Sequence, residues 1–310
     1  MRAAIEQVIE DTGATIVHTH FGSYDIATAQ AVRRLRSRGK QLVQVWHYRT
    51  ALTLPVSRRS LRRRLKDVLK FQLAGRGVDR CVAVTDALAE EVAARGMRTK
   101  ARGIVAGTDT EVFCAASDAD RAMLRDRLGV APHQILVLHM GWDWLRKGGD
   151  ILAAAAQKVH AEGGAECVYF SIGANVADLE APVQRLEPTD AVHELHQAAD
   201  IFVSASRSEG FGNGLVEALA CERVAVAALV AGQQEIFSGL GDGCIAVAPE
   251  DPDALALGIR TLVERREDWP ALGRANRAYI VERNSMRRWA RQMADEYVDL
   301  LPQGSPDSNR

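Results

Sequence analysis

Short, uninterrupted apolar runs alternate with longer segments of helical periodicity along almost all of this 310-residue chain. Two of the clearest runs are Ile135–Leu138 and Val224–Ala227. Strands that are apolar at every position, rather than at every second one, are covered on both faces, as in a parallel sheet flanked by helices. Their alternation with helices of about 10–15 residues predicts βαβ units and a doubly wound α/β fold.

The length predicts two domains. We expect two Rossmann-like, parallel-sheet domains that face a cleft, because ligands of such sheets bind outside the carboxyl ends of the strands. The first domain is predicted to hold only four strands, at Thr15–Thr19, Gln41–Trp46, Asp79–Val84 and Gly103–Ala106. For the second we expect strands at Ile135–Met140, Cys167–Ile172, Val183–Leu186, Ile201–Ser204, Val224–Ala227 and Cys244–Ala248.

A polar stretch near 113–133 separates the two halves in the sequence. The predicted domains are residues 1–116, an incomplete first domain on the acceptor side, and residues 117–285, the donor domain. A helix over 286–302 is expected to pack back on the first domain through Met286, Trp289, Met293 and Val298. Residues 303–310 are predicted to be a flexible tail.

Composition excludes several classes of protein. The net charge is −1, from 39 basic and 40 acidic residues, so nucleic acid is not an expected partner. No apolar run reaches the ~18 residues that a membrane-spanning helix needs, and the charged N-terminus does not read as a secretory signal. The five cysteines form no Cys-x-x-Cys pair, which favours a reducing compartment, and we expect a cytoplasmic location.

The most informative stretch runs from the apolar strand Ile201–Ser204 into a helix that begins near Asn213. Three glycines in five residues (Gly210, Gly212, Gly214) form the turn between them. Such a turn lets backbone approach a ligand closely, and the new helix offers free N–H groups to an anion. Glu209 lies in the turn and Glu217 within the helix, and paired carboxylate acceptors suit the vicinal hydroxyls of a sugar or ribose.

This stretch resembles the family 4 retaining glycosyltransferases of the GT-B fold, whose Glu-x7-Glu signature falls on Glu209 and Glu217. The resemblance continues through 224–227 and 231–236. It implies that Glu209 contacts the donor hexose and Glu217 the ribose hydroxyls. It also implies a donor-binding turn made of Gly210, Phe211, Gly212, Asn213, Gly214 and Leu215.

Residues 140–150 resemble the family's Gly-Arg-(x4)-Lys-Gly element, in which an arginine and a lysine hold the donor diphosphate. Lys147 matches the lysine, whereas Trp142 stands where the family has arginine. We infer that Arg146 supplies the missing charge. Preorganised cations stabilise a diphosphate as it leaves, so no metal is expected.

Two predicted strands of the first half end in histidines, His18 and His20 on one and His47 on the other. By resemblance His47 lies near the donor phosphates and the reaction centre, although each histidine is also compatible with a plain buried side chain. A zinc site at His18 and His20 is not expected, because no third ligand is in view.

Residues 57–71 carry seven basic side chains and one acidic one on an amphipathic pattern. They predict a helix over about 57–74 that could contact an anionic membrane surface. An ordinary Rossmann helix with solvated arginines fits the same pattern, and nothing in it resembles a nucleic-acid recognition module.

The resemblance thus implies a retaining, metal-independent hexosyltransferase that uses a UDP- or GDP-sugar and a hydroxyl acceptor, in glycan or glycoconjugate biosynthesis such as that of a polysaccharide. Glu209, His47 and Lys147 are its expected catalytic residues. The family's opening strand and glycine-rich loop have no counterpart here, so we expect an N-terminally shortened protein. The alternatives are a non-catalytic sugar-nucleotide-binding or partner protein and a doubly wound UDP-sugar epimerase, which would not carry the Glu-x7-Glu turn.

Overall fold

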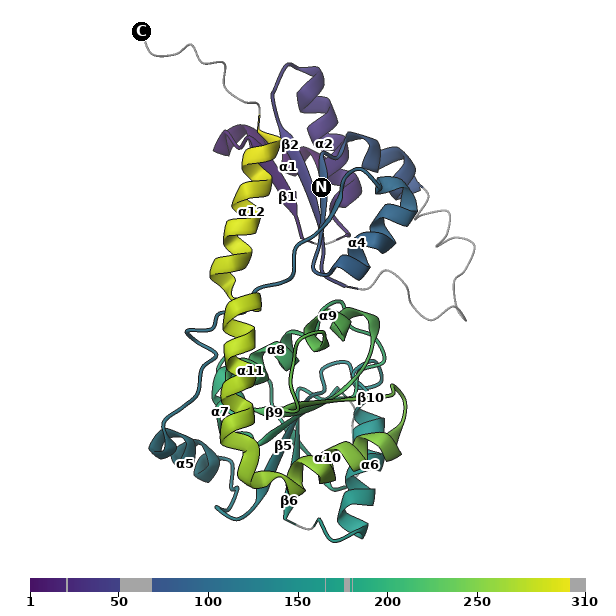
Figure 1. The fold of residues 1–310 in the computed structure, drawn as a ribbon. Coiled ribbons are helices and arrows are strands. Elements are labelled where there is room, and N and C mark those ends of the chain that lie inside the picture. Colours follow the sequence, from purple (N-terminus) through teal and green to yellow (C-terminus); the bar gives the residue numbers. More distant parts are fainter. Residues whose placement is uncertain (21, 51–68, 165, 176–178, 180, 302–310) are drawn as a thin grey trace. The chain divides into compact units, whose positions relative to one another are not determined.

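The computed structural model describes residues 1–20, 22–50, 69–164, 166–175, 179 and 181–301. The chain divides into two compact units. The first consists of Met1–Ala106 with Arg287–Arg310, and the second of Gly107–Met286. Each unit contains a parallel sheet with helices packed on it (Figure 1), which agrees with the predicted α/β class.

The first unit contains a four-stranded parallel sheet in the order β1-β2-β3-β4. Its strands are β1 (Ile16–Thr19), β2 (Val43–Tyr48), β3 (Arg80–Ala83) and β4 (Ala101–Gly103). Its α-helices are α1 (Arg2–Thr12), α2 (Asp25–Ser37), α4 (Asp86–Val92) and nearly all of α12 (Met286–Leu300). The described part of this unit also contains short π-helical turns at Leu69–Ala74 and Ala93–Met97 and a 3-10 turn at Gly75–Gly77.

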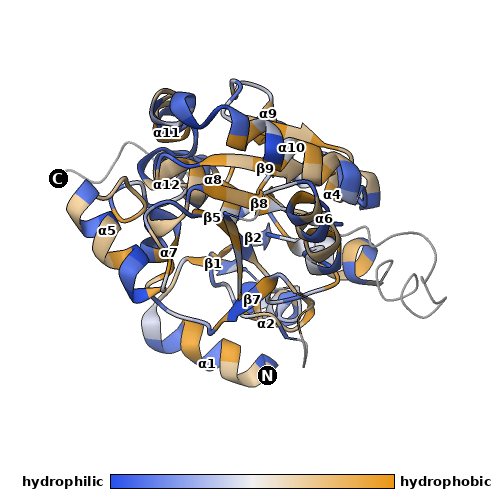
Figure 2. Cartoon of the chain, turned by 90° about the horizontal axis from the view of Figure 1, so that it is seen from below, coloured by the Kyte–Doolittle hydropathy of each residue, from blue (hydrophilic) through white to orange (hydrophobic). Residues whose placement is uncertain are grey.

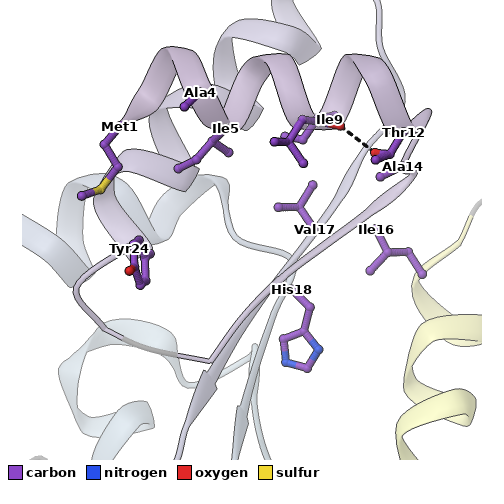
Figure 3. A pocket seen from close by; sticks show the side chains of 11 residues that line it. Met1, Ala4, Ile5, Ile9, Thr12, Ala14, Ile16, Val17, His18 and Tyr24 are labelled. Atoms are coloured by element: carbon purple, nitrogen blue, oxygen red, sulfur yellow. Dashed lines mark hydrogen bonds between the residues drawn. The ribbon is translucent and has the colours of Figure 1, made fainter.

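The two faces of β1 pack against different helices. Val17 points toward α1, where it joins a small core with Ile9 and lines an apolar pocket between α1 and β1 (Figure 3). Ile16 packs on the other side, with Met293 of α12. Side chains of a strand alternate between its two faces with a period of two. His18 therefore lies on the same face of β1 as Ile16.

The C-terminal helix α12 packs on the first sheet through Trp289, Met293 and Tyr297. Arg80 Nε of β3 lies 2.7 Å from Glu296 Oε2, which adds an ion pair to the apolar contact. Two of the four side chains expected to pack there do not, because Met286 and Val298 are 41% and 60% exposed. The buried stripe of α12 is therefore narrower than the sequence predicted.

The second unit contains a six-stranded parallel sheet in the order β10-β9-β8-β5-β6-β7. Its strands are β5 (Ile135–Met140), β6 (Cys167–Ile172), β7 (Val183–Leu186), β8 (Ile201–Ser204), β9 (Val224–Ala228) and β10 (Cys244–Val247). Its α-helices are α5 (Asp118–Arg127), α6 (Gly149–Ala161), α7 (Val192–Ala198), α8 (Asn213–Ala220), α9 (Gln234–Phe237), α10 (Pro252–Glu264) and α11 (Trp269–Asn284), with 3-10 turns at Ala231–Gln233 and Arg266–Asp268.

Strands β8 and β9 are fully buried, β5 is buried up to Met140, and β9 is hydrophobic along its length (Figure 2). Helices α6 and α10 pack together beside the sheet through Leu152, Ala156 and Ile259. Four of the six strands begin and end where the sequence predicted. In the first unit the predicted strand at 103–106 is wrong in its bounds, because β4 ends at Gly103, although the Ile104 amide still donates to the Ala83 carbonyl.

The N-terminus of α5 supplies a measurable local contribution to stability. Ser117 Oγ accepts a hydrogen bond from the Asp120 amide at 3.1 Å and donates one to the Asp120 carboxylate. We expect Ser117→Ala to lower the free energy of unfolding by about 1 kcal/mol, the usual effect of losing an N-cap. Urea unfolding measures this loss. Thr261→Ala is the control, because the Thr261 hydroxyl only donates to the Leu257 carbonyl within the same helix. Equal urea midpoints in the two variants would contradict a stabilising N-cap at Ser117.

Candidate functional site

The second sheet has one topological switch point, between β5 and β8. Taken in chain order, its strands are arranged 3-2-1-4-5-6, so the chain proceeds outward in opposite directions from these two strands. In open α/β sheets the crevice at the carboxyl ends of such strands is where ligands bind. The loops that leave β5 and β8 there, residues 141–148 and 205–212, carry most of the predicted donor-site residues.

Lys147 and Glu209 meet at this edge of the sheet. Lys147 Nζ donates to Glu209 Oε1 at 2.6 Å, and Ser206 Oγ donates to the same oxygen at 2.7 Å. Both charged side chains are largely buried, with 12% of Lys147 and 9% of Glu209 exposed. A buried charge is strongly destabilising when its partner is removed, so Lys147 and Glu209 depend on each other.

Arg146 contributes a second cation beside this pair. Its Nη1 lies 3.9 Å from Glu209 Oε2, while its Nε donates to Asp143 at 2.6 Å. Trp142, which is 58% exposed, places its ring 4.9 Å from both the Arg146 guanidinium and the Lys147 ammonium. The aromatic ring at the family's arginine position therefore contacts both cations through its π-face.

Close backbone approach holds the two loops together. Gly148 has φ +72°, and a Cβ there would lie 1.9 Å from the Ala205 carbonyl oxygen. A Cβ on Gly232 would lie 2.2 Å from the Glu209 carbonyl oxygen. Arg207 adds a bidentate pair to Asp150 of α6, with both N–H···O distances 2.8 Å, and this pair lowers the pKa of Asp150. Lys147 and Glu209 are thus positioned by backbone that only glycine permits.

His139, at the end of β5, supports the same loop and was not anticipated from the sequence. Its Nε2 lies 3.0 Å from the Lys147 carbonyl oxygen and its Nδ1 lies 3.0 Å from Ser171 Oγ. Because a carbonyl can only accept, Nε2 carries the proton and Nδ1 accepts from the serine hydroxyl. The signal available in the sequence was a histidine inside an otherwise apolar strand.

Burial lowers the pKa of His139 from about 6.5 to about 4. The neutral ring therefore contributes its full stabilisation above pH 6.5, and that contribution is lost as the pH falls toward 4, because the unfolded chain binds the proton first. We expect the free energy of unfolding to fall by up to about 1.4 kcal/mol per pH unit through this group. Between pH 6.5 and 4, the free energy of unfolding measured in urea should fall less steeply with pH in His139→Gln than in the wild type. Equal pH dependence in the two proteins would contradict a lowered pKa of His139.

The predicted donor-binding turn lies at the start of α8. Gly212 precedes this helix with φ +100° and has no side chain to cap it, while Phe211 is buried. A narrow cavity here is lined by Lys147, Glu209, Gly212, Gly214 and Leu215. Asn213 is exposed at the first turn of the helix and Gly210 is half-buried.

Two further residues extend the picture of this site. Glu217 lies one turn further along α8 and does not line the cavity described above; its Oε2 is 3.5 Å from His196 Nε2 of α7. Gln233, also unanticipated, is fully buried and donates to Ser204 Oγ at 2.9 Å. The structure thus brings Lys147, Arg146 and Glu209 together, and places Glu217 against a neighbouring helix.

His47 belongs to the first unit, where it lies on β2 beside His18 and His20. The ring centroids of His18 and His20 are 5.3 and 4.9 Å from that of His47. Burial lowers the pKa of His47 to about 3 and that of His18 to about 4, so both rings are neutral at pH 7. The reason for excluding a metal site, that no third ligand accompanies His18 and His20, was wrong: His47 is that third residue.

Most of the basic segment 57–71 lies outside the described residues, namely residues 57–68. The same holds for most of the helix predicted over 57–74. Lys70 is described, in a π-helical turn. Its ammonium is paired with Asp25 at 2.7 Å and lies 4.9 Å from the centroid of the Tyr48 ring. Lys70 is therefore engaged within the first unit. Within the described ranges, none of the helices has the length and apolarity needed to cross a bilayer.

Family models match both halves of the chain. Residues 134–265 match the model described as "Glycosyl transferases group 1", and residues 1–112 match the one described as "Glycosyltransferase Family 4". The α/β architecture and the site at the β5–β8 switch point agree with both. The chain belongs to the family 4 glycosyltransferases of the GT-B fold.

Relatives and solved structures agree with this assignment. A D-inositol 3-phosphate glycosyltransferase of Catenulispora acidiphila is 33% identical over 216 residues, which are 63% of this chain and 49% of that protein. The enzyme of the same name from Geodermatophilus obscurus is 30% identical over 52% of this chain and 40% of its own length. The chain thus spans about half the length of these relatives. Anabaena HepE in complex with UDP-glucose has a similar fold, with a TM-score of 0.83 at 20% identity over 96% of this chain and 82% of its own.

Proposed function

We propose that this protein transfers a hexose from a nucleotide diphosphate sugar to a hydroxyl acceptor and retains the configuration of the anomeric carbon. The observation that carries the proposal is the Lys147–Glu209 pair at the switch point, which joins a cation and a carboxylate at 2.6 Å. Those are the two groups needed to bind a diphosphate and a sugar hydroxyl. UDP and UDP-glucose bound in structures of Anabaena HepE support a donor of this class.

The donor diphosphate would bind between the two cations and the start of α8. Lys147 has three N–H donors and gives one of them to Glu209, so it retains donors for phosphate oxygens. The backbone N–H groups at the start of α8 add favourable dipoles for an anion. Arg146 shares its charge with Asp143 and supplies the weaker of the two cations. No metal is required at the phosphates in this scheme.

The sugar and ribose would be held by the two glutamates. Glu209 Oε2 lies 3.9 Å from Arg146 Nη1, too far for a hydrogen bond between them, so this oxygen can accept from a hexose hydroxyl. Glu217 is one-fifth exposed and would accept from the ribose hydroxyls. The turn Gly210–Leu215 would then follow the donor along its length.

The proposed reaction is a front-face substitution. The bond from the anomeric carbon to the phosphate oxygen breaks, and a bond to the acceptor oxygen forms on the same face of the sugar. The acceptor proton passes to the departing phosphate oxygen, and Lys147 and Arg146 balance the charge of the nucleotide diphosphate. The resemblance implies a place for His47 near the reaction centre, but no step of the proposed reaction is assigned to it.

Calorimetric titration with UDP- and GDP-hexoses, with and without added Mg²⁺, tests donor binding. A hydrolysis assay with NMR detection of the released sugar then tests bond cleavage. We expect binding of one donor class without dependence on Mg²⁺, and slow hydrolysis that first releases the anomer of the donor. Binding without hydrolysis or transfer would favour the non-catalytic alternative, and absence of binding would overturn the donor site.

The cellular setting belongs to the proposal as well. A cytoplasmic protein in glycan or polysaccharide biosynthesis, with peripheral contact to an anionic membrane through residues 57–71, fits the sequence pattern. Because Lys70 is paired with Asp25, that contact would depend on the arginines of 58–64 and Lys66. Vesicle sedimentation with and without anionic lipid measures it.

A further inference from the structure

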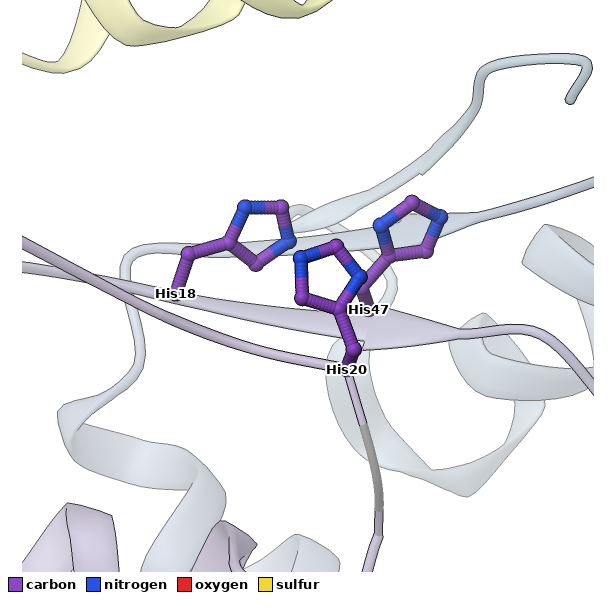
Figure 4. Close-up of side chains that lie close together, drawn as sticks. All are labelled: His18, His20 and His47. Atoms are coloured by element: carbon purple, nitrogen blue, oxygen red, sulfur yellow. The ribbon is translucent and has the colours of Figure 1, made fainter. Parts of the chain in front are cut away.

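Three histidines of the first unit converge on one point. His18 lies on β1, His20 follows that strand directly, and His47 lies on β2 (Figure 4). Residues two apart on a strand share a face, and the pairing of Thr19 with Trp46 places His20 opposite His47. One ring nitrogen from each of the three lies within 4.8 Å of the others. The cluster is therefore a direct consequence of strand register.

Several of these nitrogens have no hydrogen-bond partner although they are buried. Among the residues that the structure describes, this holds for Nε2 of His18, Nδ1 of His20 and both ring nitrogens of His47. A buried polar atom left unsatisfied costs about 1–3 kcal/mol. A neutral imidazole has one lone-pair nitrogen, so the three rings offer one lone pair each, and the unsatisfied cluster points to a ligand that accepts them.

Tyr297 of α12 fixes the orientation of one of the rings. Its hydroxyl lies 2.5 Å from Nδ1 of His18, which leaves Nε2 of His18 for the cluster. Metal-binding histidines are almost always oriented in this way, by a hydrogen bond at the second ring nitrogen. Trp289, also on α12, lies parallel to the His47 ring at a centroid distance of 6.4 Å and adds an apolar wall.

We infer that His18, His20 and His47 form a binding site for a divalent transition-metal ion, with Zn²⁺ the best fit. Three imidazoles and one open position, taken by water or a hydroxyl, make a tetrahedral zinc site with bonds of about 2.0–2.1 Å. The three nitrogens lie within 4.8 Å of one another, and rotation of the rings would bring them to that geometry. All three ligands belong to the first unit, so the inference does not rest on the proposed donor site.

The donor set selects among metals, because the cluster offers three imidazoles and holds no carboxylate. Mg²⁺ and Ca²⁺ need oxygen ligands and are excluded by this donor set. A borderline metal that forms strong bonds to neutral imidazole is favoured instead.

Zinc titration of the 310-residue chain, followed by X-ray absorption of the loaded protein, tests the site. We expect one Zn²⁺ per chain with a nitrogen and oxygen first shell and no sulfur. His47→Gln should weaken binding at least tenfold, and Tyr297→Phe about 10- to 100-fold. His133→Gln, at an exposed histidine of the second unit, should bind as the wild type does.

Sulfur in the first shell would assign the metal to a cysteine and overturn the inference. Equal affinity for Zn²⁺ in His47→Gln and the wild type, or no binding of Zn²⁺ at all, would overturn it as well. Circular dichroism of each variant shows whether it is folded. If His47→Gln fails to fold, the absorption spectrum of the wild type and the Tyr297→Phe affinity still decide the matter.

Discussion

Lys147→Met is expected to lower kcat for sugar transfer about 100- to 1000-fold, the usual effect of removing one preorganised donor at a developing negative charge. The ammonium lies 2.6 Å from Glu209 and is 12% exposed, whereas Arg146 is 30% exposed, so water screens the charge of Lys147 less. Its charge matters most as the diphosphate departs, so kcat should fall more than KM rises. Steady-state kinetics with a saturating donor measures both quantities.

Lys158→Met is the matched control, since Lys158 forms a surface ion pair with Asp253 on the same unit. It should leave kcat within about twofold of the wild type, as expected for an exposed pair. A Lys147→Met enzyme with unchanged kcat and raised KM would show that the lysine only anchors the ground state. That result would contradict the proposed role in leaving-group stabilisation.

Glu209→Gln is expected to lower kcat/KM for transfer by well over tenfold. The amide cannot balance the buried Lys147 ammonium, and it replaces a carboxylate oxygen that would accept from a hexose hydroxyl. If Glu209 binds the sugar rather than the nucleotide, the substitution weakens binding of a UDP- or GDP-hexose more than binding of the free nucleotide. Paired titrations with donor and free nucleotide measure this difference.

Glu194→Gln provides the comparison, because Glu194 is paired with Arg127 at the surface of the same unit. It should change neither titration. If Glu209→Gln lowers the affinity for the donor and for the free nucleotide equally, Glu209 contacts the phosphates and not the hexose. Unchanged transfer would remove it from the site.

The sequence predicted the second sheet well because most of its strands are continuous apolar runs, β7 (Val183–Leu186) with its Gln-Arg centre being the exception. Strands β5, β6, β7 and β8 were placed to the residue. The first unit was harder to predict, because it includes π-helical turns at Leu69–Ala74 and Ala93–Met97 that the pattern of hydrophobic residues does not predict.

Candidate residues for the site could be proposed from the sequence, but the contacts between them could not. Lys147 and Glu209 are 62 positions apart, and only the neighbouring positions of β5 and β8 in the sheet bring them together. His139 was missed because a histidine in an apolar strand carries no motif. The cluster of His18, His20 and His47 depends on the register of β1 and β2, which spacing along the chain does not specify.

A crystal structure of the protein soaked with a UDP- or GDP-hexose tests the central claim most directly. The account predicts diphosphate oxygens within hydrogen-bond distance of Lys147 Nζ and the start of α8, and a hexose hydroxyl on Glu209. A nucleotide bound elsewhere on the chain, with the Lys147–Glu209 pair unchanged, would contradict it.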